Sequence, residues 1–366
     1  MSAGGVHVAL VVSGLPSCAM GERARAFAKR LSGRFRVTVA YRGPTRAMGA
    51  LRLALALARG RPDVVYVLDV SVAGVLAGVG YKLVARRPLV LDTGDAAYAL
   101  ARSGGLRGPL GLALTFALEQ LALHAADAVV VRGTLHRGVL AHLRKPIEVV
   151  QDGVETATFA PRDGRAVREK LGLDGRIVLG VVGSSVWSPK LRICYGWDLV
   201  EAVALLGDLP VAGLVVGGGT GIAHLQERCR ELGIEDRVRF VPRVAYDDLP
   251  RYLGAMDVCL STQTNDLPGK VRTTGKLPLY LAAGRGVLAS DVGEASLVLE
   301  ASMRVPYEGV VDRAYPARLA ARVRELAKRP GAFATQDELV RLARERFDYD
   351  VLGDRVAALL DRVAAR

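Results

Sequence analysis

The chain has 366 residues, more than one ordinary hydrophobic core accommodates, so its length predicts two domains. Lys and Arg number 50 against 37 Asp and Glu, and the net charge of +13 indicates a substrate or partner with negative charge. Nucleic acid is excluded as the expected partner, because the cations form no long run, aromatic residues make up only 5% of the chain, and no nucleic-acid-binding motif is present.

The cysteines and the N-terminal segment indicate a reducing, cytoplasmic setting. Four cysteines lie far apart and lack metal-ligand spacing. The first residues lack the basic start of a signal peptide and lead into an apolar, strand-like run. The most apolar stretch, residues 64–81, contains Asp69 and several glycines, so we interpret it as a buried strand and a helix rather than a membrane span.

Apolar runs of strand length alternate with amphipathic segments of helix length, a pattern typical of parallel sheets covered by helices. Predicted strands in the first half cover residues 6–13, 36–41, 63–68, 88–93, 127–132 and 147–153. The pattern restarts with predicted strands at 176–184, 211–219, 237–242, 256–262 and 286–291. The sequence therefore predicts an α/β protein of two doubly wound, Rossmann-like domains facing across a cleft.

A polar segment with Pro161 and several glycines separates the two halves. We place an N-terminal domain at residues 1–155, a C-terminal domain at 156–345, and a last helix at 346–366 that could cross back to the first domain. Dehydrogenases, epimerases, binding proteins and glycosyltransferases share this architecture, so the function depends on the loops.

Small and acidic residues follow two predicted strands of the first half. The loop after the first strand contains Ser17 and Gly21, where the backbone can approach a ligand, although the dinucleotide fingerprint GxGxxG is absent. Asp92 and Asp95 follow the fourth strand, where a carboxylate could hold sugar hydroxyls, act as a base, or cap the next helix. His124, on the apolar side of a later helix, is expected in the interior.

Polar residues also follow the strands of the second half. Ser184 and Lys190 come after its first strand and supply donors and charge for a phosphate. Gly218 is the middle one of three glycines that end the next strand, which indicates close contact with a ligand or with a neighbouring loop. Arg243 and Val244 follow the third strand, where main-chain groups can contact a nucleobase.

The segment PGKVRTTGKLPLYLAAGRGVLAS, residues 268–290, joins a basic loop to an apolar helix. Its threonines precede the predicted helix, where hydroxyls and amides bind phosphate oxygens. Lys270, Arg272 and Lys276 supply charge to neutralise a diphosphate. A solvated basic loop is the alternative, but the position at the end of a strand favours a diphosphate site.

In this order, these residues resemble a retaining glycosyltransferase of family 4, which has the GT-B fold. The resemblance extends over residues 6–300 and is carried by MGERARAFAKRL, EVVQDGVETATFAP, RVRFVPRVAYDDLPRYLGAMDVCL and KLPLYLAAGRGVLASDVGEA. It implies a nucleoside-diphosphate sugar bound mainly by the second domain and an acceptor bound mainly by the first. It also implies transfer with retention, without a cofactor or an obligatory metal.

The resemblance and the residue types together define a candidate site. By resemblance, Gly21 matches a glycine whose amide approaches the donor phosphates, and Asp95 stands where an aspartate follows a histidine. The predicted catalytic residues are Asp95, Lys190 and Lys276, and the predicted acceptor-binding residue is Asp92. The predicted donor-binding residues are Gly21, Ser184, Gly218, Arg243, Val244, Lys270, Arg272, Thr273 and Thr274.

Several family positions hold other residue types. Two glutamates that the family has eight positions apart are replaced by Val271 and Leu279, and Gly94 replaces the histidine. The usual Arg and Lys after the first strand of the second domain are replaced by Ser184 and Tyr195. Lys190 and Arg192 are candidate substitutes for those cations.

These departures keep two alternatives open: a catalytically silent GT-B homologue that binds nucleotide or partners an active transferase, and a nucleotide-sugar epimerase. The acceptor could be a glycan, a lipid-linked molecule or a small molecule. The apolar helix at residues 108–123 and the basic charge would suit peripheral contact with the inner face of an anionic membrane, but the same helix also suits a buried position.

Overall fold

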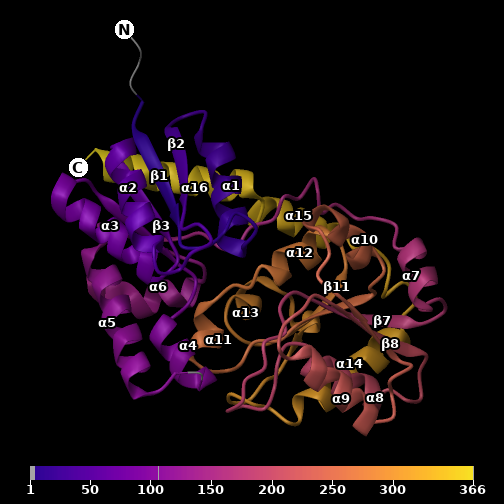
Figure 1. Cartoon of the computed structure of the whole chain (residues 1–366). Helices are drawn as coiled ribbons and strands as arrows, with labels where there is room; N and C mark the ends of the chain where they lie inside the picture. The colour runs from indigo at the N-terminus through magenta and orange to yellow at the C-terminus, as the bar shows by residue number, and fades with distance from the viewer. Residues whose placement is uncertain (1–4, 106, 366) are drawn as a thin grey trace.

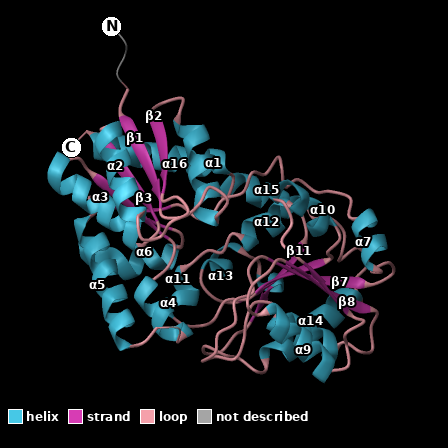
Figure 2. Cartoon of the chain, in the orientation of Figure 1, coloured by secondary structure: helices cyan, strands magenta, loops and turns pink. Residues whose placement is uncertain are grey.

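The computed structural model describes residues 5–105 and 107–365. They form two α/β domains, each with a six-stranded parallel sheet between layers of helices (Figures 1 and 2). The strand order is β2-β1-β3-β4-β5-β6 in the first sheet and β12-β11-β10-β7-β8-β9 in the second. The predicted α/β fold with two doubly wound domains is confirmed.

The first sheet is buried on both faces. Every residue of β1 (His7–Val12), β3 (Val64–Leu68), β4 (Leu89–Thr93) and β5 (Ala128–Val131) is buried, as expected of parallel strands between helices. The outer strands are β2 (Arg36–Tyr41) and β6 (Ile147–Val149). One face packs on α1 (Ala19–Leu31) and α16 (Tyr349–Ala364), and the other on α2 (Gly49–Gly60), α3 (Val72–Ala85), α5 (Pro109–Ala125) and α6 (Thr134–Leu140). The short helix α4 (Ala97–Gly104) links β4 to α5.

The second sheet consists of β7 (Ile177–Val182), β8 (Val211–Val216), β9 (Val238–Val241), β10 (Val258–Ser261), β11 (Gly286–Ser290) and β12 (Arg304–Val305). Helices α8 (Trp197–Leu205), α9 (Ile222–Glu231) and α14 (Tyr315–Ala327) cover one face. Helices α10 (Leu249–Gly254), α12 (Lys276–Ala282) and α15 (Asp337–Arg346) cover the other. The remaining helices are α7 (Arg165–Leu171), α11 (Leu267–Val271) and α13 (Glu294–Val298). The two-residue strand β12 is too short to give a sequence pattern and was not predicted.

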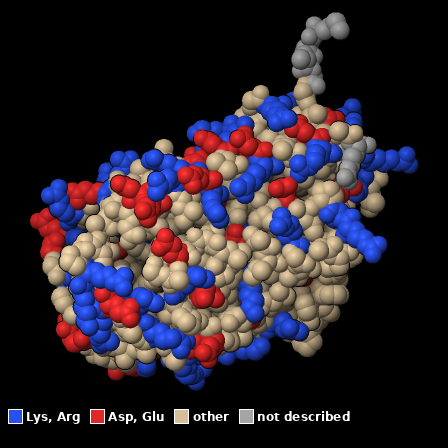
Figure 3. Space-filling view, turned by 180° about the vertical axis from the view of Figure 1, so that it is seen from behind, with Lys and Arg blue, Asp and Glu red and all other residues tan. Residues whose placement is uncertain are grey.

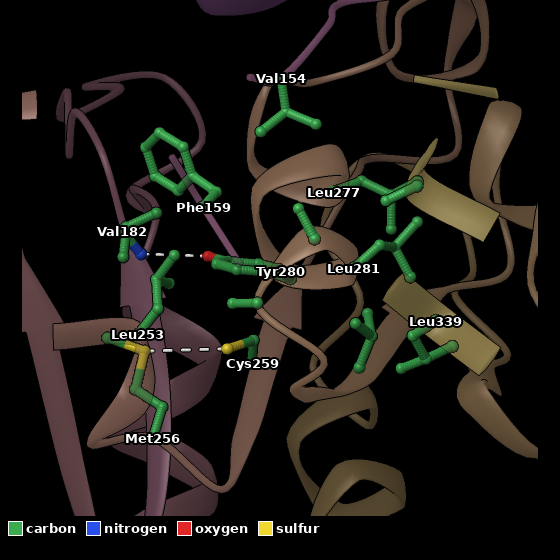
Figure 4. Close-up of a cluster of buried hydrophobic side chains, with 14 of the residues drawn as sticks. Val154, Phe159, Val182, Leu253, Met256, Cys259, Leu277, Tyr280, Leu281 and Leu339 are labelled. Carbon is green, nitrogen blue, oxygen red and sulfur yellow. Dashed lines mark hydrogen bonds between the residues drawn. The ribbon is translucent and has the colours of Figure 1, made fainter. Parts of the chain in front are cut away.

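The core under α12 fixes the position of the loop in front of it. Tyr280 is fully buried, and its hydroxyl oxygen accepts a hydrogen bond of 3.0 Å from the backbone N–H of Val182 at the end of β7 (Figure 4). Leu277 and Leu281 pack in the same cluster against Leu339 of α15. The first residue of α12, Lys276, is therefore held close to the carboxyl end of β7.

The chain returns to the first domain through α16. Asp348 caps this helix by accepting a 2.8 Å hydrogen bond from the N–H of Asp350. The rings of Tyr349 and Phe27 meet edge to face with centroids 5.7 Å apart, and Arg30 of α1 donates to Asp350 at 2.7 Å. The boundaries proposed at residues 155 and 345 remain predictions, because this packing does not define them.

Helix α5 differs from one expectation. His124 is exposed, not interior, and its Nδ1 lies 2.9 Å from the carbonyl oxygen of Gln120. The inner side of α5 buries Ala122 and Leu123 against the first sheet, while Leu110 on the outer side is 75% exposed. In residues 5–105 and 107–365, no helix combines the length and apolar character needed to cross a bilayer.

Candidate active site

A cavity of about 610 Å³ lies between the two domains, at the carboxyl ends of strands from both sheets. Its walls come from the loop after β1 and the start of α1, from the loops after β7, β8 and β9, and from the start of α12. The strand order reverses beside β1 in the first sheet and beside β7 in the second. Ligands of doubly wound sheets bind at such reversal points, and this volume suits a small-molecule substrate.

Glycines let the loops after β7 and β8 pack closely together. Gly217 has φ of +146°, and a Cβ there would overlap the carbonyl oxygen of Gly183. Gly219, with φ of +133°, lies in the same way against the carbonyl of Ser185. Gly218 between them has no neighbour within 4 Å of such a Cβ and lines the cavity. The outer two glycines therefore serve loop packing, and the middle one exposes backbone to a ligand.

Lys276 brings a cation into the cavity from α12. Its Nζ lies 3.6 Å from the centroid of the Tyr195 ring, within cation–π distance. Burial lowers the pKa of Lys276 to about 8; repulsion from Arg272 adds to this, whereas Asp152 opposes it. The lysine is thus a desolvated cation beside the loop of Gly183 and lies over the residue that replaces the family's lysine at position 195.

The loop before α12 touches the first domain directly. Arg272 forms an ion pair of 2.8 Å with Asp95, and the two side chains are equally half-buried. The hydroxyl of the buried Thr273 donates to the carbonyl oxygen of Arg132. Two predicted donor-binding residues therefore contact the first domain, and one of them holds the predicted catalytic aspartate.

A buried charge network lies under the cavity in the first domain. Asp92 has no exposed surface, and it accepts hydrogen bonds from Arg23 at 2.9 Å and from the Tyr66 hydroxyl at 2.8 Å. The Nε of Arg132 lies 3.4 Å from Asp92 and 3.6 Å from Asp152. Burial opposes the charge of Asp92, but the arginines outweigh it and lower the pKa of this carboxyl. Asp92 therefore orients Arg23 and Arg132 and does not itself reach the cavity wall.

Neither aspartate caps the following helix, so the capping alternative is wrong. The first N–H groups of α4, those of Ala97 and Tyr98, donate instead to the carboxylate of Glu119. Glu119 comes from α5 and is distant in sequence, so local spacing could not reveal this cap.

The remaining predicted residues divide into two groups. Ser184, Arg243 and Val244 line the cavity, and Arg243 donates to the carbonyl of Ser17 across the cleft at 3.0 Å. Lys190 is exposed and donates to the Arg102 carbonyl at 3.2 Å. Lys270, which is exposed, and Thr274, which is half-buried, also lie outside the cavity lining.

Gly21 is buried in α1, where its N–H lies 3.4 Å from the Cys18 sulfur and a Cβ would overlap the Pro16 carbonyl.

Arg23, Arg132 and Asp152 line the cavity but were not predicted. Two of them carry a signal in the sequence: Arg132 is the last residue of a predicted apolar strand, and Asp152 lies in the segment EVVQDG, near the end of a predicted strand. Arg23 lies among several arginines of α1, and only the fold shows that it is buried. A Cβ at Gly94 would overlap the guanidinium of Arg132, so this arginine excludes a larger side chain from the position where the family has histidine.

The two positions of the family's glutamates hold apolar side chains. Leu279 lines the cavity, and Val271 is fully buried at the end of α11. In the described parts of the chain, no group of three or more His, Cys, Asp and Glu side chains is arranged to hold a metal ion. The prediction that no metal is required has not been tested.

Residues 177–329 match the family model described as glycosyl transferases group 1. D-inositol 3-phosphate glycosyltransferase of Mycobacterium sp. (strain KMS) is 34% identical to this chain over 187 residues, which are 48% of this chain and 39% of that relative. 2-deoxystreptamine glucosyltransferase of Streptomyces kanamyceticus is 30% identical over 193 residues, 49% of this chain and 46% of that relative. The chain thus spans less than half of the length of these two curated relatives.

Solved glycosyltransferase structures match nearly the whole chain. The structure of HepE from Anabaena in complex with UDP and glucose has a TM-score of 0.74 and 19% identity, and the match covers 98% of this chain and 100% of HepE. Sucrose-phosphate synthase of Thermosynechococcus elongatus has a TM-score of 0.77 and 16% identity, covering 98% and 99%. The GT-B fold and the resemblance to a GT-B glycosyltransferase are therefore confirmed.

Proposed function

We propose that the protein is a glycosyltransferase that moves a sugar from a nucleoside-diphosphate sugar to an acceptor hydroxyl, with retention. The observation that carries the proposal is Lys276, a half-buried cation in a glycine-lined cavity between the two sheets, where partial removal from water lowers its pKa. The match of residues 177–329 to the family model of group 1 glycosyl transferases supports it, as does the likeness to HepE, which was solved with UDP and glucose. The nucleobase is undetermined, and UDP is the first nucleotide to test.

The main barrier to transfer is the negative charge that develops on the departing diphosphate. A preorganised cation in a site of low dielectric stabilises such charge without reorganising. In this proposal Lys276 provides the stabilisation, with the hydroxyl of Ser184 and the exposed backbone of Gly218 facing the same cavity. Neither a cofactor nor an obligatory metal takes part, and the site fixes both substrates in orientation, which is worth roughly 7 to 11 kcal/mol.

Arg272 and Asp95 act together in the proposal. The diphosphate competes with Asp95 for the guanidinium of Arg272, so donor binding weakens their 2.8 Å ion pair. Asp95 is then available to interact with the acceptor on the side of the first domain. Asp92 supports the acceptor side indirectly by holding Arg132.

The first experiment measures thermal stability of the purified protein with UDP, GDP, ADP, dTDP and NAD. A ligand at a hundred times its dissociation constant adds about 2.7 kcal/mol, which raises the melting temperature by several degrees. We expect a shift with one nucleoside diphosphate and none with NAD. No shift with any diphosphate would contradict the donor site.

Two lysine variants test the role of Lys276. We expect Lys276→Ala to lower turnover at least about a hundredfold, because removal of one such donor costs roughly 2.7 to 4 kcal/mol. Lys190→Ala is the matched control, because Lys190 is exposed outside the cavity. Equal rates for both variants and wild type, with melting temperatures unchanged, would remove Lys276 from the mechanism.

A catalytically silent homologue is the second candidate, and the apolar residues Val271 and Leu279 favour it. It would bind a nucleoside diphosphate but not release one from the sugar donor. Slow hydrolysis of the donor with water as acceptor, abolished in Lys276→Ala, would exclude this candidate.

For the active enzyme we propose a cytoplasmic location at the inner face of the membrane, with a glycan, lipid-linked or small-molecule acceptor.

A further inference from the structure

The outer surface of the first domain is unusually apolar. The helices α2, α3 and α5 cover one face of the first sheet, and in Figure 1 they form the outer edge of that domain. Fourteen exposed large hydrophobic side chains lie among residues 5–105 and 107–155, against four in the rest of the described chain. Contiguous exposed apolar surfaces often mark contact sites for a protein or a membrane.

The exposed side chains form ridges along the helices. In α3, Val72, Leu76 and Leu83 are 60%, 48% and 74% exposed. In α5, Leu110 and Leu114 are 75% and 63% exposed, and Leu121 continues the row at 41%. Both rows follow the spacing i, i+4 and i+11, which places the residues of each row on one side of its helix. Leu51 and Leu55, 51% and 44% exposed, form a shorter row on α2, which packs beside α3.

The charge on this surface is mainly positive, and the one ion pair that its described arginines form joins Arg87 to Asp63 at 3.4 Å. Exposed arginines stand at the helix ends: Arg59 and Arg61 at the end of α2, Arg86 and Arg87 after α3, and Arg107 before α5. Glu119 is the one acidic residue in α2, α3 and α5, and its carboxylate is turned inward to accept from Ala97 and Tyr98. In Figure 3 the right-hand side of the molecule, which holds the first domain, shows a broad tan area bordered by blue side chains.

We propose that this surface, formed by the outer faces of α2, α3 and α5, docks on an anionic lipid bilayer. The leucine and valine rows enter the boundary between headgroups and acyl chains, and the arginines at the helix ends contact lipid phosphates. A second copy of the chain fits less well, because a symmetric contact would bring the same arginines face to face. The sequence suggested α5 alone; the structure adds α2 and α3 and joins the three helices into one surface.

Vesicle co-sedimentation of the full chain tests the proposal. We expect binding to vesicles of phosphatidylglycerol and phosphatidylcholine in equal parts, and much weaker binding to phosphatidylcholine alone. The bound fraction should fall as salt increases, since each cation near the surface contributes about fivefold to partitioning at low salt. Absence of binding to the anionic vesicles would overturn the proposal.

The variant Leu83→Glu/Leu114→Glu assigns the binding to this surface. We expect it to lower the partition coefficient at least tenfold, with each single substitution intermediate. Leu205→Glu is the matched control, because Leu205 is 49% exposed on α8 of the second domain. All variants should melt at the wild-type temperature and respond equally to UDP, because the substituted side chains lie outside the core and the cavity. Full vesicle binding by the double variant would overturn the assignment.

Light scattering after size-exclusion chromatography tests whether a second copy of the chain, rather than a bilayer, covers this surface. We expect wild type and Leu83→Glu/Leu114→Glu to be in the same oligomeric state. A wild-type dimer that becomes a monomer in the double variant, together with no vesicle binding, would replace the bilayer by a second copy of the chain.

Discussion

At Lys276, partial burial opposes the charge of the side chain. Its pKa of about 8 reflects the cost of holding an ammonium group away from water and near Arg272. Because the folded pKa lies below that of an unfolded lysine, this group makes stability rise with pH between about 8 and the unfolded value. A bound diphosphate would remove the conflict by supplying the missing negative charge.

We therefore predict that UDP binding takes up a proton at alkaline pH. At pH 8.5, a lysine with a pKa of about 8 is mostly neutral, and full protonation on binding takes up about 0.8 proton. Isothermal titration calorimetry in two buffers with different ionisation enthalpies measures this number. Lys276→Arg is the control, because arginine stays charged at every accessible pH and should bind without the uptake. Equal uptake in both proteins would assign the proton to another group.

Asp92 is the residue on which the buried charges of the first domain depend. We predict that Asp92→Asn destabilises the protein by about 3 to 5 kcal/mol, because Arg23 and Arg132 lose a buried countercharge. Urea unfolding measures the loss. Asp163→Asn, at an exposed ion pair with Arg165, should unfold like wild type.

The carboxyl group of Asp92 also makes the stability of the protein depend on pH. The pKa of Asp92 is lowered in the folded state, so its contribution to stability is present at neutral pH and is lost as the pH falls through the lowered pKa. The difference between wild type and Asp92→Asn should therefore narrow below about pH 4. A difference that stays constant down to pH 3 would contradict an ionised Asp92.

At the scale of elements, three successive glycines after β8 have separate tasks. We predict that Gly217→Ala lowers the melting temperature clearly, because its φ of +146° and the Gly183 carbonyl leave no room for a methyl group. Gly218→Ala should melt within about 2 °C of wild type but bind UDP at least tenfold more weakly, since its methyl group would point into the cavity. Reversed outcomes would show that the middle glycine is the structural one.

The elements differ in how far the sequence predicts them. Parallel strands are buried on both faces, so β1, β3, β7 and β8 appear as uninterrupted apolar runs and were predicted closely. The short β12 left no such signal. For α5, an apolar helix has the same composition whether its outer side meets protein, lipid or water, so only the fold shows that this side is uncovered.

The sequence predicts which loops form the candidate site, but it does not predict which of their side chains reach the cavity. Strand ends place Ser184, Arg243 and Lys276 at the cavity, because the carboxyl ends of parallel strands meet at one edge. The position of Lys190 depends on the path of a long loop, and that path carries it to Arg102 instead. Asp92 and Arg23 are 69 residues apart, so their pairing has no local signal in the sequence.

At the scale of the whole molecule, the first domain depends on residues that follow the second domain. Leu352, Val356 and Leu360 of α16 are fully buried and lie in the same core as Phe27 of α1. We predict that residues 1–155 alone fail to fold, because the face of the sheet beside α1 would remain open. Circular dichroism and proteolysis of this fragment, with and without residues 347–366 joined by a flexible linker, test this. A stable fragment without the added helix would contradict it.

Because of this arrangement, the first domain is synthesised before the second domain but is completed after it. The ribosome finishes the first sheet early but adds α16 only about 200 residues later, an interval of roughly 10 to 40 s at ordinary rates of synthesis. During this time the nascent chain presents an open hydrophobic face while the strands of the second domain, β7 to β12, are being synthesised. Chaperone demand and aggregation in the cell should therefore concentrate on the half of the protein that is made first, and codons that slow synthesis of the second half should increase both.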